Sequence, residues 1–142
     1  MKKFLILLGC LILAVVVLCN PFVQWHEHQL KQAMAVLQRD TVTLNEIVPF
    51  DWDKVYTFPP YTSKTEIEEK IGFRSRAIEE TVSEGMVQLI FVDGDKVTAS
   101  VCGYASALGY QVEFADMVAF EEEALFSVER KDGIVCLKEM GK

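Results

Sequence analysis

The sequence predicts an α+β domain with a mainly antiparallel sheet, placed behind an apolar N-terminal segment. Three observations predict it: an uncharged run over residues 4–19, a short helix with start and stop signals over 63–72, and two β-rich hairpins near 86–102 and 125–138. With 142 residues, the chain has room for one globular domain and one appended segment. Helices followed by hairpins are typical of this fold class.

The apolar run follows two N-terminal lysines and precedes Asn20. This order is typical of a segment that the secretion machinery recognises, with its positive end kept in the cytoplasm. Three outcomes stay open: a retained transmembrane anchor, a signal peptide cleaved near Asn20, and lipid attachment at Cys10. We expect residues 1–19 to be a signal anchor or signal peptide that contacts the cytoplasmic membrane through residues 4–19. The rest is expected outside that membrane, or secreted if the signal is cleaved.

Residues 20–42 are expected to form an amphipathic helix and linker, helical to about residue 40. Apolar side chains recur there at intervals of three and four residues, namely Leu30, Ala33, Met34 and Leu37. Trp25 lies just beyond the apolar run, where both a membrane interface and a core position stay open. His26 and His28 are two positions apart, so a helix directs them to different sides and no metal site is expected.

Residues 43–142 are expected to form the α+β domain. A capping-box pattern at 43–46 predicts one helical turn, and residues 50–58 alternate as a strand. A second capping box begins at Ser63 and predicts a short helix that ends at Gly72.

The short helix has one apolar face and one charged pair. Ile67 and Ile71 lie on the same side, and we expect that side to cover one face of the sheet. Glu66 and Lys70 have the i, i+4 spacing at which a helical ion pair forms.

Two hairpins are predicted from β-rich runs that flank Asp-Gly turns. The first joins residues 86–92 to 96–102, and a loop is expected over 103–109. The second joins 125–130 to 134–138. A two-residue turn there predicts that Val128 faces Leu137 and Arg130 faces Val135. The core face then holds Phe126, Val128, Val135 and Leu137, with Cys136 on the other face.

The part beyond residue 19 is strongly acidic. It holds 12 basic and all 21 acidic residues, which gives it a net charge of −9. Such a surface repels phosphate backbones, so no nucleic-acid partner is expected. The densest acidic cluster, residues 121–123, is interpreted as a solvated loop or helix start, because it lacks the oxygen-ligand spacing of a calcium loop.

The four cysteines fall into two groups. Cys10 and Cys19 lie in the apolar segment and are expected to act as small hydrophobic residues. Cys102 and Cys136 lie in the domain, where an oxidising compartment would permit a disulfide if their strands are neighbours and both side chains share a face.

No motif in the sequence points to catalysis. There is no G-x-S-x-G elbow, no H-E-x-x-H zinc motif and no phosphate-binding loop, and both histidines lie beside the apolar segment. We therefore expect no enzyme activity, no cofactor and no metal; a small envelope hydrolase acting through a carboxylate pair is the least favoured alternative.

An aromatic stretch is the candidate binding site. It contains Trp52, Asp53, Tyr56 and Tyr61. Under the structural interpretation, Trp52, Tyr56 and Phe58 share one strand face and pack beneath the helix. Under the functional interpretation, the aromatic residues line a groove for a peptide, glycan or lipid, with Asp53 and Tyr61 providing polar contacts.

The motifs Trp-Asp-Lys-Val-Tyr at 52–56 and Pro-Tyr-Thr-Ser at 60–63 resemble an uncharacterised family of short exported, membrane-anchored bacterial proteins. The resemblance extends over the helix at 62–72 and the hairpin at 87–101, about half of the chain, and does not include residues 103–142. It implies a location in the bacterial envelope and supplies neither an activity nor a ligand.

These observations together predict a non-catalytic, membrane-anchored binding protein outside the cytoplasmic membrane. Its expected partner is an envelope protein or a cell-wall component. The alternative is a structural accessory subunit of a membrane complex, in which the apolar segment and the helix at 22–40 make the contacts.

Overall fold

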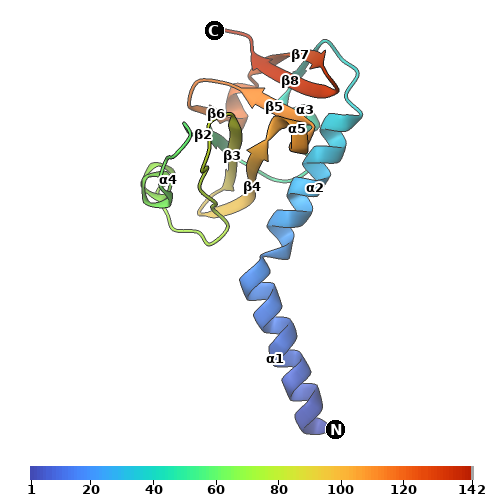
Figure 1. Cartoon of the computed structure of the whole chain (residues 1–142), viewed down its shortest axis with the longest axis vertical. Helices are drawn as coiled ribbons and strands as arrows, with labels where there is room; N and C mark the ends of the chain where they lie inside the picture. The colour runs from blue at the N-terminus through green and yellow to red at the C-terminus, as the bar shows by residue number, and fades with distance from the viewer. Residues whose placement is uncertain (142) are drawn as a thin grey trace.

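The computed structural model describes residues 1–141, apart from the side chain of Cys19. Within that range the chain forms five helices, one 3-10 turn and two four-stranded sheets (Figure 1). The helices are α1 (Lys2–Cys19), α2 (Pro21–Ala35), α3 (Leu44–Ile47), α4 (Lys64–Ile71) and α5 (Ala105–Leu108), and η1 is Phe120–Glu122. The strands are β1 (Thr41–Thr43), β2 (Lys54–Thr57), β3 (Met86–Asp93), β4 (Lys96–Tyr104), β5 (Tyr110–Glu113), β6 (Met117–Ala119), β7 (Leu125–Lys131) and β8 (Ile134–Glu139).

The α+β class with mostly antiparallel pairing is confirmed, although the strands divide between two sheets where one was expected. One sheet has the order β1-β7-β8-β5 and the other β4-β3-β2-β6. β5 pairs with β8 in parallel, and every other pair is antiparallel. Each predicted hairpin forms the centre or edge of its own sheet: β1 and β5 flank the β7–β8 hairpin, and β2 and β6 extend the β3–β4 hairpin. The short strands β1, β5 and β6 are absent from the sequence prediction.

Two apolar clusters hold the domain together. The larger one combines inward side chains of both sheets with α2, among them Leu30, Phe91, Phe126 and Leu137. The smaller one lies on the other face of the β4-β3-β2-β6 sheet, where Ile67 of α4 is fully buried. The expectation that the short helix covers one sheet face is therefore confirmed.

The second hairpin has the predicted register. Val128 faces Leu137 and Arg130 faces Val135. The turn residues Asp132 and Gly133 both have positive φ, at 52° and 80°, as a two-residue type I′ turn requires. The first hairpin, β3 and β4, is also confirmed, but β4 continues to Tyr104 and is followed by α5, so residues 103–109 do not form a simple loop.

α4 begins and ends where the sequence predicts. Ser63 forms a capping box with Glu66, and Gly72 ends the helix with φ of 91°. The predicted pair between Glu66 and Lys70 is wrong, because both side chains have other partners. Glu66 accepts hydrogen bonds from Ser63, which lowers the pKa of its carboxyl, and Lys70 forms an ion pair of 2.8 Å with Asp116.

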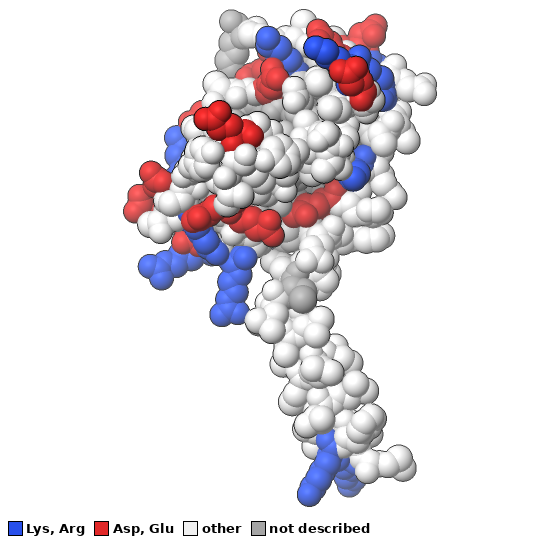
Figure 2. Space-filling model, in the orientation of Figure 1, with Lys and Arg blue, Asp and Glu red and all other residues white. Residues whose placement is uncertain are grey.

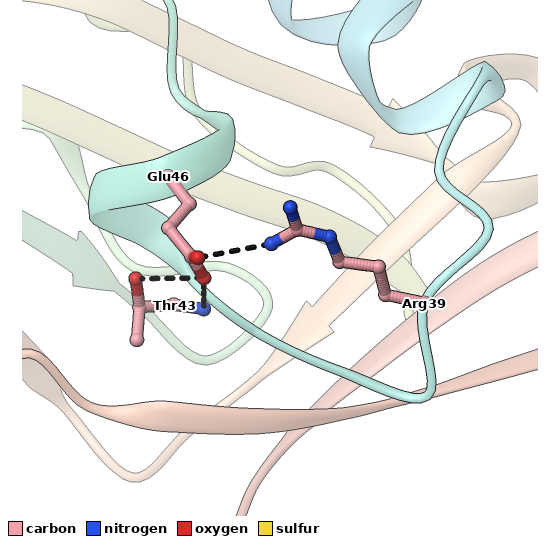
Figure 3. Close-up of polar contacts among 3 residues, drawn as sticks. All are labelled: Arg39, Thr43 and Glu46. Atoms are coloured by element: carbon pink, nitrogen blue, oxygen red, sulfur yellow. Dashed lines mark hydrogen bonds and ion pairs between the residues drawn. The ribbon is translucent and has the colours of Figure 1, made fainter.

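The turn predicted at residues 43–46 is α3, and its capping box includes an arginine (Figure 3). The Glu46 carboxylate accepts from the backbone N–H of Thr43 at 3.0 Å and from Arg39 at 2.9 Å. These contacts lower the pKa of Glu46. They fix the chain between α2 and α3 on the domain surface.

α2 ends at Ala35, earlier than the expected residue 40. The Arg130 guanidinium donates to the carbonyls of Ala35 and Leu37, which lack helical partners at this end. The chain then turns so that Thr41–Thr43 pairs with β7. Residues 20–42, expected to form a helix and linker, thus pack against the domain expected over residues 43–142.

α1 extends away from the domain, and α2 continues from it along the domain's side (Figure 1). The two helices meet at Asn20, whose φ of 42° is left-handed, and they bend by 52°. Within residues 1–141 no single helix meets the length and apolarity needed to cross a membrane; α1 and α2 meet them only when taken together.

Candidate functional site

The structure does not bring the aromatic candidates into one groove. Trp52 lies before β2, is 5% exposed and packs in the larger cluster against Phe91 and Phe120. Tyr56 is also buried but lies in the smaller cluster beside Phe58. The structural interpretation is correct for Tyr56 and Phe58, which pack on the α4 side. It is wrong for Trp52, which lies in the other core.

The two polar candidates lie apart from each other. The Asp53 carboxylate accepts from the backbone N–H of Gly94, and its backbone bonds to Val92 and Phe120. Tyr61 is exposed in the turn before α4, where its backbone N–H donates to Thr81. Asp53 thus connects β2 to the turn after β3 and to η1, whereas the side chain of Tyr61 is exposed on the surface away from it.

The disulfide considered for the domain is not formed in the structure. Cys102 lies on β4 and Cys136 on β8, in different sheets, and both are free thiols. Burial raises the pKa of each thiol. Cys136 lies on the outer face of its sheet, as the hairpin register predicts.

The most distinctive polar arrangement lies where α2 covers the free edge of β4. His26 donates from Nδ1 to the carbonyl oxygen of Thr98 at 2.7 Å, and its ring stacks on Phe50. The next residue, Glu27, accepts at 3.1 Å from the backbone N–H of Ser100. Two adjacent side chains of α2 therefore satisfy two backbone groups of an edge strand, which would otherwise be open to pairing with another chain.

The two histidines have separate environments. His26 contacts β4, whereas His28 contacts Gln32 within α2 at 3.0 Å. In the part of the chain that the structure describes, neither histidine is paired with a serine or cysteine, and no cluster of three metal-ligating side chains is present. The acidic residues 121–123 are exposed in and after η1.

Two adjoining cavities flank Glu27, and we call them together the α2 cleft. Their volumes are about 370 and 240 Å³, and both are lined by Gln24, Glu27, Glu79 and Ser100. The larger cavity also includes Val17 and Leu18 of α1, together with Arg76. The smaller one includes Lys31, Cys102 and Tyr110. The cleft thus combines α2, the β4 edge and the loop at residues 72–85.

Two carboxylates of the cleft, those of Glu27 and Glu79, repel each other. Partial burial of Glu27 and repulsion from Glu79 raise its pKa to about 7, although the hydrogen bond from Ser100 opposes the rise. Burial, with a smaller contribution from Glu27, raises the pKa of Tyr110 well above its usual value. Near neutral pH, Glu27 is therefore partly protonated, and a cation placed beside it would favour its charged form.

Two buried side-chain oxygens near this edge have no hydrogen-bond partner within residues 1–141. They are Ser100 Oγ and Gln88 Oε1, on residues 6% and 2% exposed. Ser100 faces Ile90 across the β3–β4 ladder, so its side chain lies on the sheet face that Ala77 and Ile78 cover. An unpaired hydroxyl at this depth is costly unless a ligand or water completes it.

Sequence reasoning missed this site but had one signal for it. Glu27 occupies a helical position between Val23 and Leu30, both of which are buried. A carboxylate on the apolar face of an amphipathic helix indicates a polar partner beneath it. Glu79 and Ser100 gave no such signal, because only the fold brings them to α2.

A comparison of the chain with protein-family models, curated proteins and solved structures found no match. The resemblance to short exported bacterial proteins therefore stays a prediction, and the interpretation of the site rests on its geometry.

Proposed function

We propose that the protein is a non-catalytic binding protein, held to the cytoplasmic membrane by α1, with its α+β domain outside the cytoplasm. The supporting observation is the exposure of α1. Its large apolar side chains from Phe4 to Leu18 are 42–74% exposed, and its described residues contribute to neither core. Figure 2 shows an uncharged surface along this helix, between the lysines at its start and the domain. Water is a poor solvent for such a surface.

The dimensions and flanking residues of α1 suit this role. Its 18 residues span about 27 Å, a little less than the roughly 30 Å of a bilayer's hydrocarbon core, so we expect the start of α2 to complete the span. Phe22 and Trp25 at the start of α2 are 70% and 59% exposed, which suits side chains at a membrane–water interface. The exposure of Trp25 excludes the core position that the sequence left open.

The packing of α2 favours a binding protein over a structural accessory subunit. The accessory interpretation needs the apolar face of this helix for contacts with other subunits. Val23, Leu30 and Met34 instead bury that face in the protein's own domain. The α2 cleft, beside the end of α1, is the surface that we assign to binding.

A pair of reporters tests the anchor and its orientation. A phosphatase that folds only outside the cytoplasm and a fluorescent protein that matures only inside it are each fused behind residue 142. We expect phosphatase activity in the membrane fraction after an alkaline wash. Fluorescence without phosphatase activity would contradict the proposal. The matched control lacks residues 2–19 and should lose phosphatase activity.

Exchange of α1 distinguishes binding from accessory function. Replacing residues 1–16 by an unrelated apolar anchor segment leaves α2 and the cleft residues Val17 and Leu18 in place. A binding protein keeps its crosslinked partner after this exchange, whereas an accessory subunit that contacts its complex through α1 loses it.

A further inference from the structure

The α2 cleft joins an apolar end to a polar end. Val17 and Leu18, near the end of α1, line the larger cavity together with Glu27 and Glu79. Glu27 lies seven residues beyond Asn20, about 10 Å along α2, and the 52° bend shortens this distance along the axis of α1. If α1 spans the bilayer, the carboxylates therefore lie at the depth of the outer-leaflet headgroups.

The charges in the larger cavity have both signs. Arg76 lines this cavity together with Glu27 and Glu79, and it is exposed on the loop at residues 72–85. In Figure 2, acidic side chains line the base of the domain, and basic side chains extend from it beside α1. A purely anionic ligand would be repelled by the carboxylates, and a purely cationic one would be opposed by Arg76. A ligand with an ammonium and a phosphate matches both.

The side chain of Ser100 indicates, independently of the charges, that the cleft accepts a hydrogen-bond donor. Its hydroxyl is buried, lies on the sheet face that carries the cavity residue Ala77, and has no partner among the described residues. A primary ammonium has three N–H donors, enough for both carboxylates and this hydroxyl oxygen. A trimethylammonium group has none, so the cleft should distinguish the two headgroups.

We propose that the α2 cleft binds the headgroup of a phosphatidylethanolamine-type lipid of the outer leaflet. The ammonium lies between Glu27 and Glu79, near Ser100; the phosphate faces Arg76, and the acyl chains run along Val17 and Leu18. This inference rests on the proposed membrane anchoring, because it needs α1 in the same leaflet as the lipid. It identifies the ligand class of the binding site.

Native mass spectrometry of the full chain in mild detergent tests the proposal. The protein is mixed with phosphatidylethanolamine or phosphatidylcholine of identical acyl chains, and bound lipid is counted. We expect wild type to retain the ethanolamine lipid about tenfold better, the effect of one charge-assisted hydrogen bond. Glu79→Gln should remove this preference, whereas Glu121→Gln, a matched change of an exposed carboxylate outside the cleft, should keep it.

Two further variants separate recognition from folding. Ser100→Ala removes an unpaired buried hydroxyl, so it should weaken ethanolamine-lipid retention without lowering the melting temperature. Arg76→Gln should lower retention of both lipids, since both contain a phosphate. Equal retention of the two lipids by wild type would overturn the proposal, as would an unchanged preference in Glu79→Gln.

Alkaline extraction of membranes from the cells that express the protein separates the two proposals. A chain that stays in the pellet but has no lipid preference keeps the anchor and overturns the headgroup assignment. A chain released into the supernatant overturns both.

Discussion

α1 and α2 follow each other directly, yet they are stabilised in different ways. α1 is apolar on all sides and leaves its described side chains exposed, whereas α2 has one apolar stripe and buries Val23, Leu30 and Met34 against the sheets. An amphipathic helix finds its apolar partner within its own chain, whereas a uniformly apolar helix needs apolar surroundings from elsewhere. Asn20 therefore marks the boundary between the domain and the segment that we assign to the membrane.

Truncation of one leucine in each helix gives the largest contrast. Leu30 is fully buried, so Leu30→Ala should lower the free energy of unfolding by about 2–5 kcal/mol through lost burial and a cavity. Leu11→Ala on α1 should change it by less than about 0.5 kcal/mol. Urea unfolding of the full chain in mild detergent measures both. Equal losses would contradict the boundary at Asn20.

The carboxylate of Glu27 makes the attachment of α2 depend on pH. Its pKa is about 7 in the fold and lower in the unfolded chain, so the unfolded state loses this proton first. Stability from this group is present at low pH and is lost as pH rises through about 7, because ionisation then leaves a partly buried charge that is also repelled by Glu79. Arg76, Lys31 and His28 also line the cleft.

After allowance for solvent screening, the difference between pH 5 and pH 8 should be about 1–2 kcal/mol. Glu27→Gln keeps an acceptor for the Ser100 N–H and should remove this part of the pH dependence. Glu121→Gln is the control and should leave it unchanged. Urea midpoints across this range measure the effect, and identical curves for wild type and Glu27→Gln would refute it.

The end of α2 provides a smaller test. Arg130 donates to the carbonyls of Ala35 and Leu37, so Arg130→Ala should cost about 1 kcal/mol by leaving that helix end uncapped. Its neighbour Lys131 is exposed and points to the other face of β7, so Lys131→Ala is a matched control with little effect. Similar losses from both variants would argue against a role for the cap.

The junction itself should matter least to the domain. Glycine accepts the left-handed φ of Asn20, so Asn20→Gly should change the free energy of unfolding by less than about 0.5 kcal/mol. A loss above about 1 kcal/mol in urea unfolding would place the bend within the cooperative fold of the domain.

Local signals in the sequence predicted local structure well. The capping box at Ser63 and the turn at Asp132-Gly133 each determine a helix start or a register within a few residues, and both predictions are confirmed. β1 and β5 escaped prediction because three- or four-residue strands have little periodicity and obtain their partners from distant segments, β7 and β8.

The site was less predictable than the fold. Trp52 and Tyr56 have the spacing of one strand face, but pairing begins only at Lys54, so Trp52 packs into the other core. Glu27 and Ser100 are 73 positions apart, and their contact depends on α2 lying along the β4 edge. Such a meeting of polar groups is a property of the tertiary fold.

Thiol labelling in intact, right-side-out membrane vesicles tests the contrast between α1 and the domain most directly. Single-cysteine variants keep either Cys10, in the middle of α1, or Cys136, half-exposed on the outer face of its sheet. With a membrane-impermeant maleimide at pH 8, we expect Cys136 to be labelled and Cys10 to react only after denaturation in SDS. Labelling of Cys10 as fast as Cys136 in untreated vesicles would place α1 in water and contradict the account.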